Sequence, residues 1–106
     1  MTDDHGFELH PGAAQDITEI WQFIAEDNPL AATRFREDIA QAIRKLVKFP
    51  RQGHKRTDLT SRPLRFQTLR DYLIVYAPDE RPLVVIALIH GHRNPRIMAA
   101  ILRGRE

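Results

Sequence analysis

The sequence contains no cysteine, which excludes disulfide bonds and thiolate metal sites and suits a reducing compartment. It has no run of about 18 apolar residues, so no segment has the composition of a membrane-spanning helix. Residues 1–6 are acidic and polar, unlike a secretory signal peptide, and we expect them to form a disordered lead. Together these absences predict a cytoplasmic protein with no membrane partner.

Motifs for bound cofactors and for nucleophilic catalysis are also missing. The chain has no glycine-rich phosphate-binding loop, no nucleophile elbow and no zinc-binding helix motif. His90 and His92 could share one face of a strand, but a metal ion needs three or four ligands. Nothing in the sequence fixes His54 or Asp58 beside them. We therefore expect no metal and no cofactor, and a function outside small-molecule metabolism.

Basic residues are scarce in the first part of the chain, and acidic residues are scarce in the second. Residues 1–38 hold nine acids and two bases, whereas residues 39–106 hold fourteen bases and five acids. A basic segment of this size attracts anionic partners, either nucleic acid or an acidic protein segment. Opposite charges that become neighbours on folding would give the same composition without any binding face.

One hydrophobic run stands out, the seven residues from Leu83 to Ile89. Its leucine and β-branched side chains predict the central strand of a sheet, buried on both faces. We expect a chemical or recognition site where this strand leaves the core. There it leads directly into His90, Gly91, His92 and Arg93.

Two amphipathic helices are predicted ahead of that strand. Apolar residues recur at helical spacing on both sides of Asn28 and Pro29, a pair that ends one helix and caps the next. So short a connection makes the helices antiparallel, and we expect a helical hairpin over residues 12–49 with Trp21 as a core anchor. Residues 7–9 precede it as a short N-terminal strand.

The rest of the chain predicts a small antiparallel sheet. Residues 50–63 lack apolar periodicity and form a basic loop, which is either functional or a crossover kept soluble by its charge. Residues 64–93 predict a three-stranded antiparallel meander. Residues 94–106 predict a short docking helix, or a tail that becomes ordered only against a partner. The whole chain, 1–106, is expected to be a single α+β domain.

Several residues are of the types that a metal-free ribonuclease needs. Such an enzyme uses a base for the 2′-hydroxyl proton, a cation for the phosphorane charge and an acid for the leaving oxygen. Arg65, Arg70, His90 and His92 could fill these roles if the fold brings them together. The same side chains, with Arg93, could instead bind an acidic protein segment, which requires no aligned proton path.

Six short motifs follow one another between residues 16 and 93, and together they carry a family resemblance that covers residues 9–102. They are Asp16-Ile17-x-x-Ile20-Trp21, Asn28-Pro29-x-Ala31-Ala32, Phe49-Pro50-x-x-Gly53, Leu64-Arg65-Phe66, Tyr72-Leu-Ile-Val-Tyr76 and Ile89-His-Gly-His-Arg93. In order and spacing they resemble the RelE/ParE superfamily of toxins from bacterial type II toxin-antitoxin pairs, and its ParE branch in particular.

The resemblance implies a small cytoplasmic toxin that a cognate antitoxin holds inactive, with a role in plasmid stabilisation. ParE-like members act on DNA gyrase, whereas RelE-like members cleave mRNA on the ribosome. RelE-type nucleases usually carry an arginine directly after the tyrosine that begins the middle strand. This sequence has Leu73 after Tyr72, and the loss of that cation removes a phosphate stabiliser and favours the ParE-like interpretation.

We therefore expect a gyrase-binding toxin without catalytic residues. Its ParD-like antitoxin is expected to cover the groove between hairpin and sheet with a C-terminal helix and an extended tail. The expected contact residues for target or antitoxin are Arg65, Arg70, His90, His92 and Arg93. In the alternative, a RelE-like ribosome-dependent endoribonuclease, Arg65, Arg70, His90 and His92 are catalytic; otherwise nucleic acid is only an indirect partner. A third possibility is an inactive homologue kept for complex formation.

Overall fold

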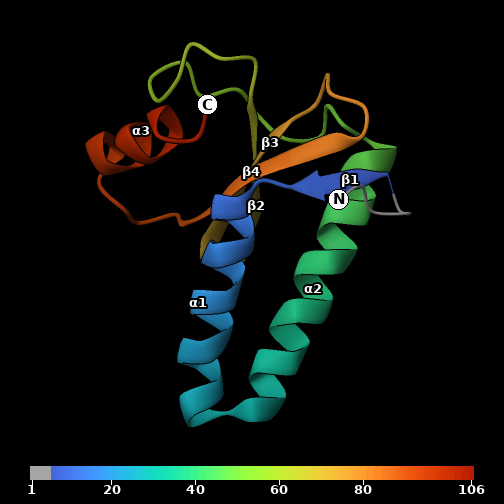
Figure 1. The fold of residues 1–106 in the computed structure, drawn as a ribbon, viewed down its shortest axis with the longest axis vertical. Helices are drawn as coiled ribbons and strands as arrows, with labels where there is room; N and C mark the ends of the chain where they lie inside the picture. The colour runs from blue at the N-terminus through green and yellow to red at the C-terminus, as the bar shows by residue number, and fades with distance from the viewer. Residues whose placement is uncertain (1–5) are drawn as a thin grey trace.

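A computed structural model describes residues 6–106 of the chain. Its elements run, in chain order, β1 (Phe7–Leu9), α1 (Pro11–Asp27), α2 (Pro29–Lys48), β2 (Arg65–Leu69), β3 (Tyr72–Ala77), β4 (Leu83–His90) and α3 (Pro95–Arg103) (Figure 1). This order confirms the predicted α+β fold. Of the lead that was predicted to be disordered, residues 1–5 lie outside the described residues and Gly6 lies within them. The carbonyl of Gly6 accepts a hydrogen bond from the Leu83 N–H at 3.0 Å.

Asn28 joins the two helices of the hairpin and caps both. Its backbone N–H donates to the Ile24 carbonyl at 2.9 Å, which ends α1, and its side-chain oxygen accepts from the Ala31 N–H at 3.0 Å, which begins α2. Pro29 then occupies the first turn of α2, where its missing N–H costs nothing. The predicted antiparallel hairpin is confirmed. No helix within residues 6–106 is long and apolar enough to cross a membrane.

The strands lie in the order β1-β4-β3-β2, so that β4 is an interior strand as predicted. The antiparallel meander of β2, β3 and β4 is also confirmed. The short β1, however, pairs with β4 in parallel, with Phe7 opposite Leu83, and the sheet is therefore mixed rather than wholly antiparallel. The whole hairpin separates β1 from the meander, so no tight turn sets the direction of this strand.

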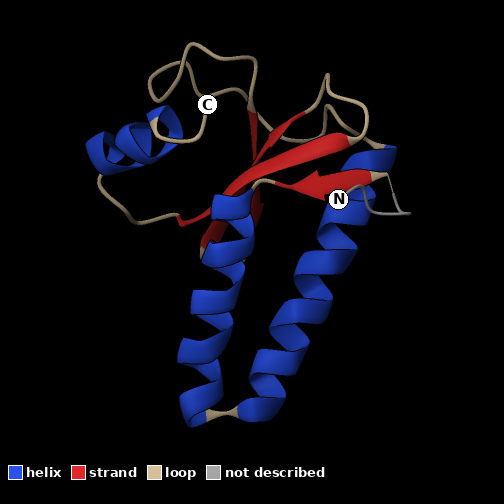
Figure 2. Ribbon diagram, viewed as in Figure 1, coloured by secondary structure: helices blue, strands red, loops and turns tan. Residues whose placement is uncertain are grey.

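Each face of the sheet packs on a separate hydrophobic core. The hairpin covers one face and projects beyond the sheet, and α3 with the loop of residues 50–64 covers the other (Figures 1 and 2). Trp21 is partly buried against the first core, and the guanidinium of Arg36 lies 5.2 Å from its ring centroid. The stripe of α2 that is fully buried in the hairpin core consists of Ala32, Phe35, Ile39, Ile43 and Leu46.

A β-bulge in β4 decides which side chains face the hairpin. Val75 pairs with Ala87 and Tyr76 pairs with Val85, so that Ile86 is an extra residue without a partner. Ile86 and Ala87 both pack in the core under α3, and Leu88 returns to the core under the hairpin. Because side chains alternate along a strand, the bulge also places His90 on the hairpin side of the sheet.

Candidate partner-binding groove

Four of the five predicted contact residues lie at one end of the sheet. His90 ends β4, His92 and Arg93 follow it, and Arg70 lies in the turn that leads to Tyr72, the partner of His90 in the sheet. Arg65 pairs with Tyr76 near the other end of β3. At about 3.3 Å per residue, Arg65 and Arg70 are separated by about 16 Å along the strand. The fold therefore brings Arg70, His90, His92 and Arg93 to one margin and leaves Arg65 apart from them.

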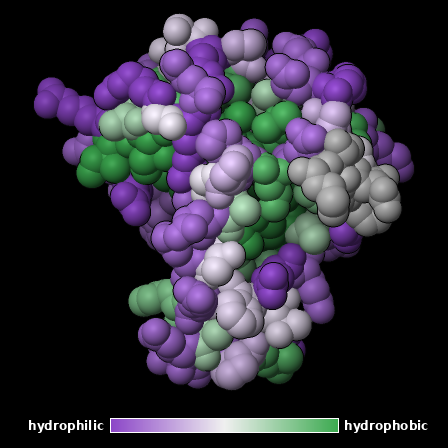
Figure 3. Space-filling view, viewed as in Figure 1, coloured by the Kyte–Doolittle hydropathy of each residue, from purple (hydrophilic) through white to green (hydrophobic). Residues whose placement is uncertain are grey.

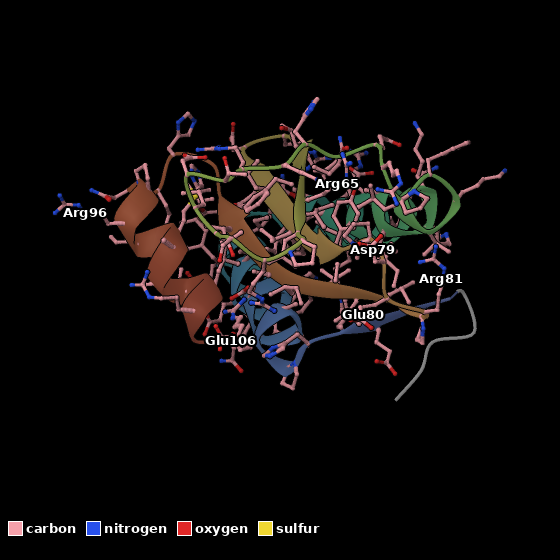
Figure 4. All side chains as sticks on the ribbon, turned by 90° about the horizontal axis from the view of Figure 1, so that it is seen from above. Arg65, Asp79, Glu80, Arg81, Arg96 and Glu106 are labelled. Atoms are coloured by element: carbon pink, nitrogen blue, oxygen red, sulfur yellow. The ribbon has the colours of Figure 1, made fainter. Side chains whose placement is uncertain are left out.

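Arg65 binds the backbone of its own chain. Its guanidinium donates to the Gly53 carbonyl at 2.7 Å and to the Arg51 carbonyl at 3.3 Å, while its Nε is buried with no hydrogen-bond partner among residues 6–106. Figure 4 labels Arg65 over the sheet, far from Arg96 on the outer side of α3. These bonds fasten the basic loop to β2, so the geometry supports a structural role for Arg65.

Arg70 is partly engaged with the hairpin. It adopts a positive φ of 54° in the two-residue turn between β2 and β3, and its guanidinium pairs with the carboxylate of Asp38 on α2. Both side chains remain substantially exposed, so the pair contributes about 1 kcal/mol or less and can be exchanged for another acid.

Aromatic rings connect the hairpin core to the exposed margin. Phe35 contacts Tyr72 edge to face at 5.7 Å between centroids, and Tyr72 contacts His90 at 5.4 Å. His92 continues the series at 5.2 Å from His90, and its backbone N–H donates to Nδ1 of His90 at 3.2 Å. A series of ring contacts therefore runs from the hairpin core to the two exposed imidazoles.

Tyr72 and His90 line a groove of about 260 Å³ between α1, the end of β4 and α3. One wall is apolar, and its most exposed member is Phe23, with 72% of its surface accessible. Arg93 lies on the rim and has no carboxylate partner within residues 6–106. The groove is lined by Asp16, Glu19, Ile20, Phe23, Tyr72, Leu88, Ile89, His90, Arg93 and Ile101.

The side chains of this groove are mainly of types that bind a partner. An exposed aromatic ring beside aliphatic side chains favours a partner with apolar anchors, and the free cation favours an acid next to them. Tyr72, His90 and Arg93 also lie together here, so the residue types for proton transfer on RNA share the same groove. Within residues 6–106 no three histidine, aspartate or glutamate side chains are grouped in a way that could hold a metal ion.

The sequence interpretation missed the apolar wall of the groove. Phe23 lies off the apolar stripe of α1, which runs through Ile17, Ile20, Trp21 and Ile24. An aromatic residue outside the core face of a helix is a signal that could have identified it. Ile101 could not be found in this way, because its spacing in the last helix is that of an ordinary core residue.

Comparison with protein families gives a match over residues 7–95. The matching family is described as the ParE toxin of type II toxin-antitoxin system, parDE. The matched span runs from β1 to the first residue of α3 and includes every groove residue except Ile101. A comparison with curated proteins gives no match.

Proposed function

Because this chain belongs to the ParE family of toxins from type II toxin-antitoxin systems, we propose that it arrests growth by binding DNA gyrase and that a ParD-like antitoxin neutralises it. The family supports a toxin with an antitoxin partner. The structural observation that carries the proposal is the groove between α1, β4 and α3.

The groove supports an antitoxin segment that combines apolar anchors with at least one acid. Phe23 is 72% exposed, and burying an aromatic side chain of this kind contributes about 1.5 to 3 kcal/mol. An acid of the antitoxin pairs with Arg93, since burial of that cation without a partner is costly. Asp16 does not repel this segment, because its carboxylate already binds Arg105 and the Leu88 N–H.

The margin formed by His90, His92 and Arg93 is the proposed contact with gyrase. His90 and Arg93 line the groove that the antitoxin fills, so the antitoxin and the target compete for the same side chains. Neutralisation then needs no change of fold in the toxin.

A gyrase assay tests the target. Purified toxin is expected to inhibit supercoiling of plasmid DNA by gyrase or to accumulate cleaved DNA, and Arg93→Glu is expected to weaken this effect at least tenfold. Arg44→Glu on α2 is the matched control, because it reverses another exposed arginine, one that lies outside the groove. Unchanged gyrase activity at saturating toxin rejects the proposed target.

The ribonuclease alternative has one observation in its favour, which is the meeting of Tyr72, His90 and Arg93 in one groove. Incubation of the toxin with ribosomes carrying mRNA distinguishes the two activities. Intact mRNA together with gyrase inhibition supports the first proposal, and cleaved mRNA with unaffected gyrase supports the alternative. Normal growth with confirmed soluble toxin and no antitoxin supports the inactive homologue.

A further inference from the structure

A second surface lies on the opposite side of the sheet from the hairpin, where the basic loop meets α3. Three hollows adjoin there and share residues. One lies between Asp58 of the loop and Arg96 and Arg103 of α3. The next joins Arg103 to Arg62, and the third joins Arg62 to Lys55 and Arg56. We call this surface the loop–helix face, and its cations are Lys55, Arg56, Arg62, Arg96 and Arg103.

Two of these cations are held by the protein itself. Arg56 makes two hydrogen bonds to Asp58, at 2.9 and 2.8 Å, and this pairing lowers the pKa of the Asp58 carboxyl. Arg62 donates to the Leu102 carbonyl at 3.0 Å and so fixes the end of α3 against the loop. The loop–helix face is thus assembled by contacts between segments about 40 residues apart, and does not depend on a bound partner for its shape.

The other three cations are unpaired. Lys55, Arg96 and Arg103 are exposed and have no carboxylate partner within residues 6–106. Glu106 borders the hollow near Arg103, and Figure 4 shows it at the opposite end of α3 from Arg96. Five cations therefore face two acids, one of which is already paired, and the face carries a net positive charge.

The remaining composition of the face favours a polyanion over a peptide. Peptide partners are anchored by buried apolar side chains, and the large exposed apolar residues of the described chain are Leu9, Phe23, Leu30, Phe49 and Ile97, none of which lines the three hollows. Apolar surface does occur on α3, on the side that is turned to the viewer in Figure 3. The large exposed apolar residue of that helix, Ile97, lies outside the three hollows. The hollows are rich instead in cations and in the hydroxyls of Thr57, Thr60 and Ser61, which are side chains of the types that contact phosphate.

We infer that the loop–helix face binds the phosphate backbone of a nucleic-acid duplex without reading its sequence. No aromatic ring lines the hollows, so the stacking that holds single strands is missing from this face. The cations and hydroxyls of the hollows are spread over the loop and both ends of α3, and side chains of these types mainly contact phosphates and sugars, which carry no sequence information. This inference goes beyond the proposed function and stands whether or not gyrase is the target.

Fluorescence anisotropy with a labelled duplex of about 20 base pairs and arbitrary sequence tests the inference. With three unpaired cations on three phosphates, log K is expected to fall with log[salt] with a slope of about −3. The triple variant Lys55→Glu, Arg96→Glu, Arg103→Glu is expected to bind at least about 100-fold more weakly at about 0.1 M salt. A second duplex of different sequence should bind equally, and a DNA and an RNA duplex of the same length identify which duplex the face prefers.

The matched control is Arg34→Glu, Arg44→Glu, Lys48→Glu on α2. It reverses three exposed cations, one of them in the last turn of a helix, as Arg103 is in α3. Thermal unfolding confirms that both variants are folded, and the pair Arg96→Gln, Arg103→Gln gives a milder version of the same change.

Three results overturn the inference. If the two triple variants bind the duplex equally weakly, binding depends on the net charge of the protein and not on the loop–helix face. Displacement of the duplex by a poly-glutamate peptide at equal charge concentration assigns the face to an acidic protein segment. Light scattering that finds self-association abolished in the loop–helix variant and kept in the control assigns the face to a contact with a second copy of the chain.

Discussion

Tyr76 is the residue on which the position of the basic loop depends most directly. Its hydroxyl accepts a hydrogen bond from the Gly53 N–H at 2.9 Å and donates one to the Pro50 carbonyl at 2.7 Å. Gly53 is required here, because a Cβ at this position would lie 2.8 Å from that hydroxyl and 2.9 Å from the Phe66 carbonyl. The motif Phe49-Pro50-x-x-Gly53 is therefore explained by a buried tyrosine from a distant strand.

Replacing Tyr76 by phenylalanine is expected to destabilise the protein by about 2 kcal/mol near neutral pH, because two backbone groups lose their partner. Burial is the main cause that raises the pKa of the Tyr76 phenol above its ordinary value of 10.0. The unfolded chain therefore ionises first, and the stabilising effect of the neutral phenol is lost as the pH rises above about 10. The difference between wild type and Tyr76→Phe should shrink over this range.

Urea unfolding at about pH 8 and about pH 11 measures both effects. Tyr72→Phe is the control, because the Tyr72 hydroxyl makes no hydrogen bond within residues 6–106, and it should cost well under 1 kcal/mol. If Tyr76→Phe lowers the free energy of unfolding by the same amount at both pH values, the stabilisation does not come from the neutral phenol of Tyr76.

At the scale of elements, α3 is fastened to the rest of the fold by Arg105, just beyond its end. The guanidinium makes two hydrogen bonds to the Asp16 carboxylate of α1, at 2.5 and 2.9 Å, and a third to the Ile86 carbonyl at 3.2 Å. Asp16 in turn accepts from the Leu88 N–H at 3.0 Å. One ion pair thus ties α1, β4 and the end of the chain together, and it occupies backbone groups of β4 beyond the last residue that pairs with β1.

The Arg105 side chain also crosses the start of α1 directly over Gly12. A Cβ on Gly12 would lie 2.4 Å from Nε of Arg105, so any other residue here would have to displace the guanidinium from its present position. The hydrogen bonds to Asp16 raise the pKa of Arg105 above its ordinary value, so the guanidinium stays charged.

Arg105→Ala is expected to destabilise the protein by about 2 kcal/mol, since it leaves a largely buried carboxylate with a single hydrogen bond. This corresponds to a fall in Tm of roughly 10 °C. Hydrogen exchange should become faster in α3 before it does in α2, because the substitution removes the hydrogen bonds that hold the end of α3 to the sheet. Arg103→Ala, which removes an exposed and unpaired cation, should change Tm by no more than about 3 °C. Equal effects of the two substitutions would contradict the role of Arg105.

At the scale of the whole molecule, two surfaces with different chemistry meet at α3. The groove between α1, β4 and α3 presents apolar side chains with Arg93 at its rim, and the loop–helix face is rich in cations and hydroxyls. Because α3 contributes Ile101 to the first and Arg96 and Arg103 to the second, the two surfaces lie on different sides of one short helix. They can therefore be altered independently.

Phe23→Ser is expected to weaken antitoxin binding by about 10- to 100-fold because less apolar surface is buried, while duplex binding stays unchanged. The triple variant of the loop–helix face should do the reverse. Isothermal titration with the antitoxin and anisotropy with the duplex measure both affinities for both variants. Phe49→Ser, which truncates another exposed phenylalanine outside the groove, is the control and should leave both affinities within about threefold. A variant that weakens antitoxin binding and duplex binding equally would show that the groove and the loop–helix face are a single binding surface.

The sequence by itself determined the elements and much of their order. The apolar stripe of α2, the caps at Asn28 and Pro29, and the apolar run from Leu83 are local patterns, and each of them predicted its helix or strand correctly. The motifs along the chain indicated the family that residues 7–95 match. These inferences succeed because helix caps and side-chain periodicity act between residues a few positions apart.

Only the tertiary structure decided which side chains meet. The bulge at Ile86 turns Leu88 and His90 toward the hairpin, and a register of this kind depends on pairing with β3 that no local pattern encodes. Arg65, predicted to join the binding margin, instead binds the loop that Tyr76 holds in place. Arg105 lies against Asp16, 89 positions earlier in the chain. In each case the contact is long-range, and its position follows from how the hairpin, the sheet and α3 pack together.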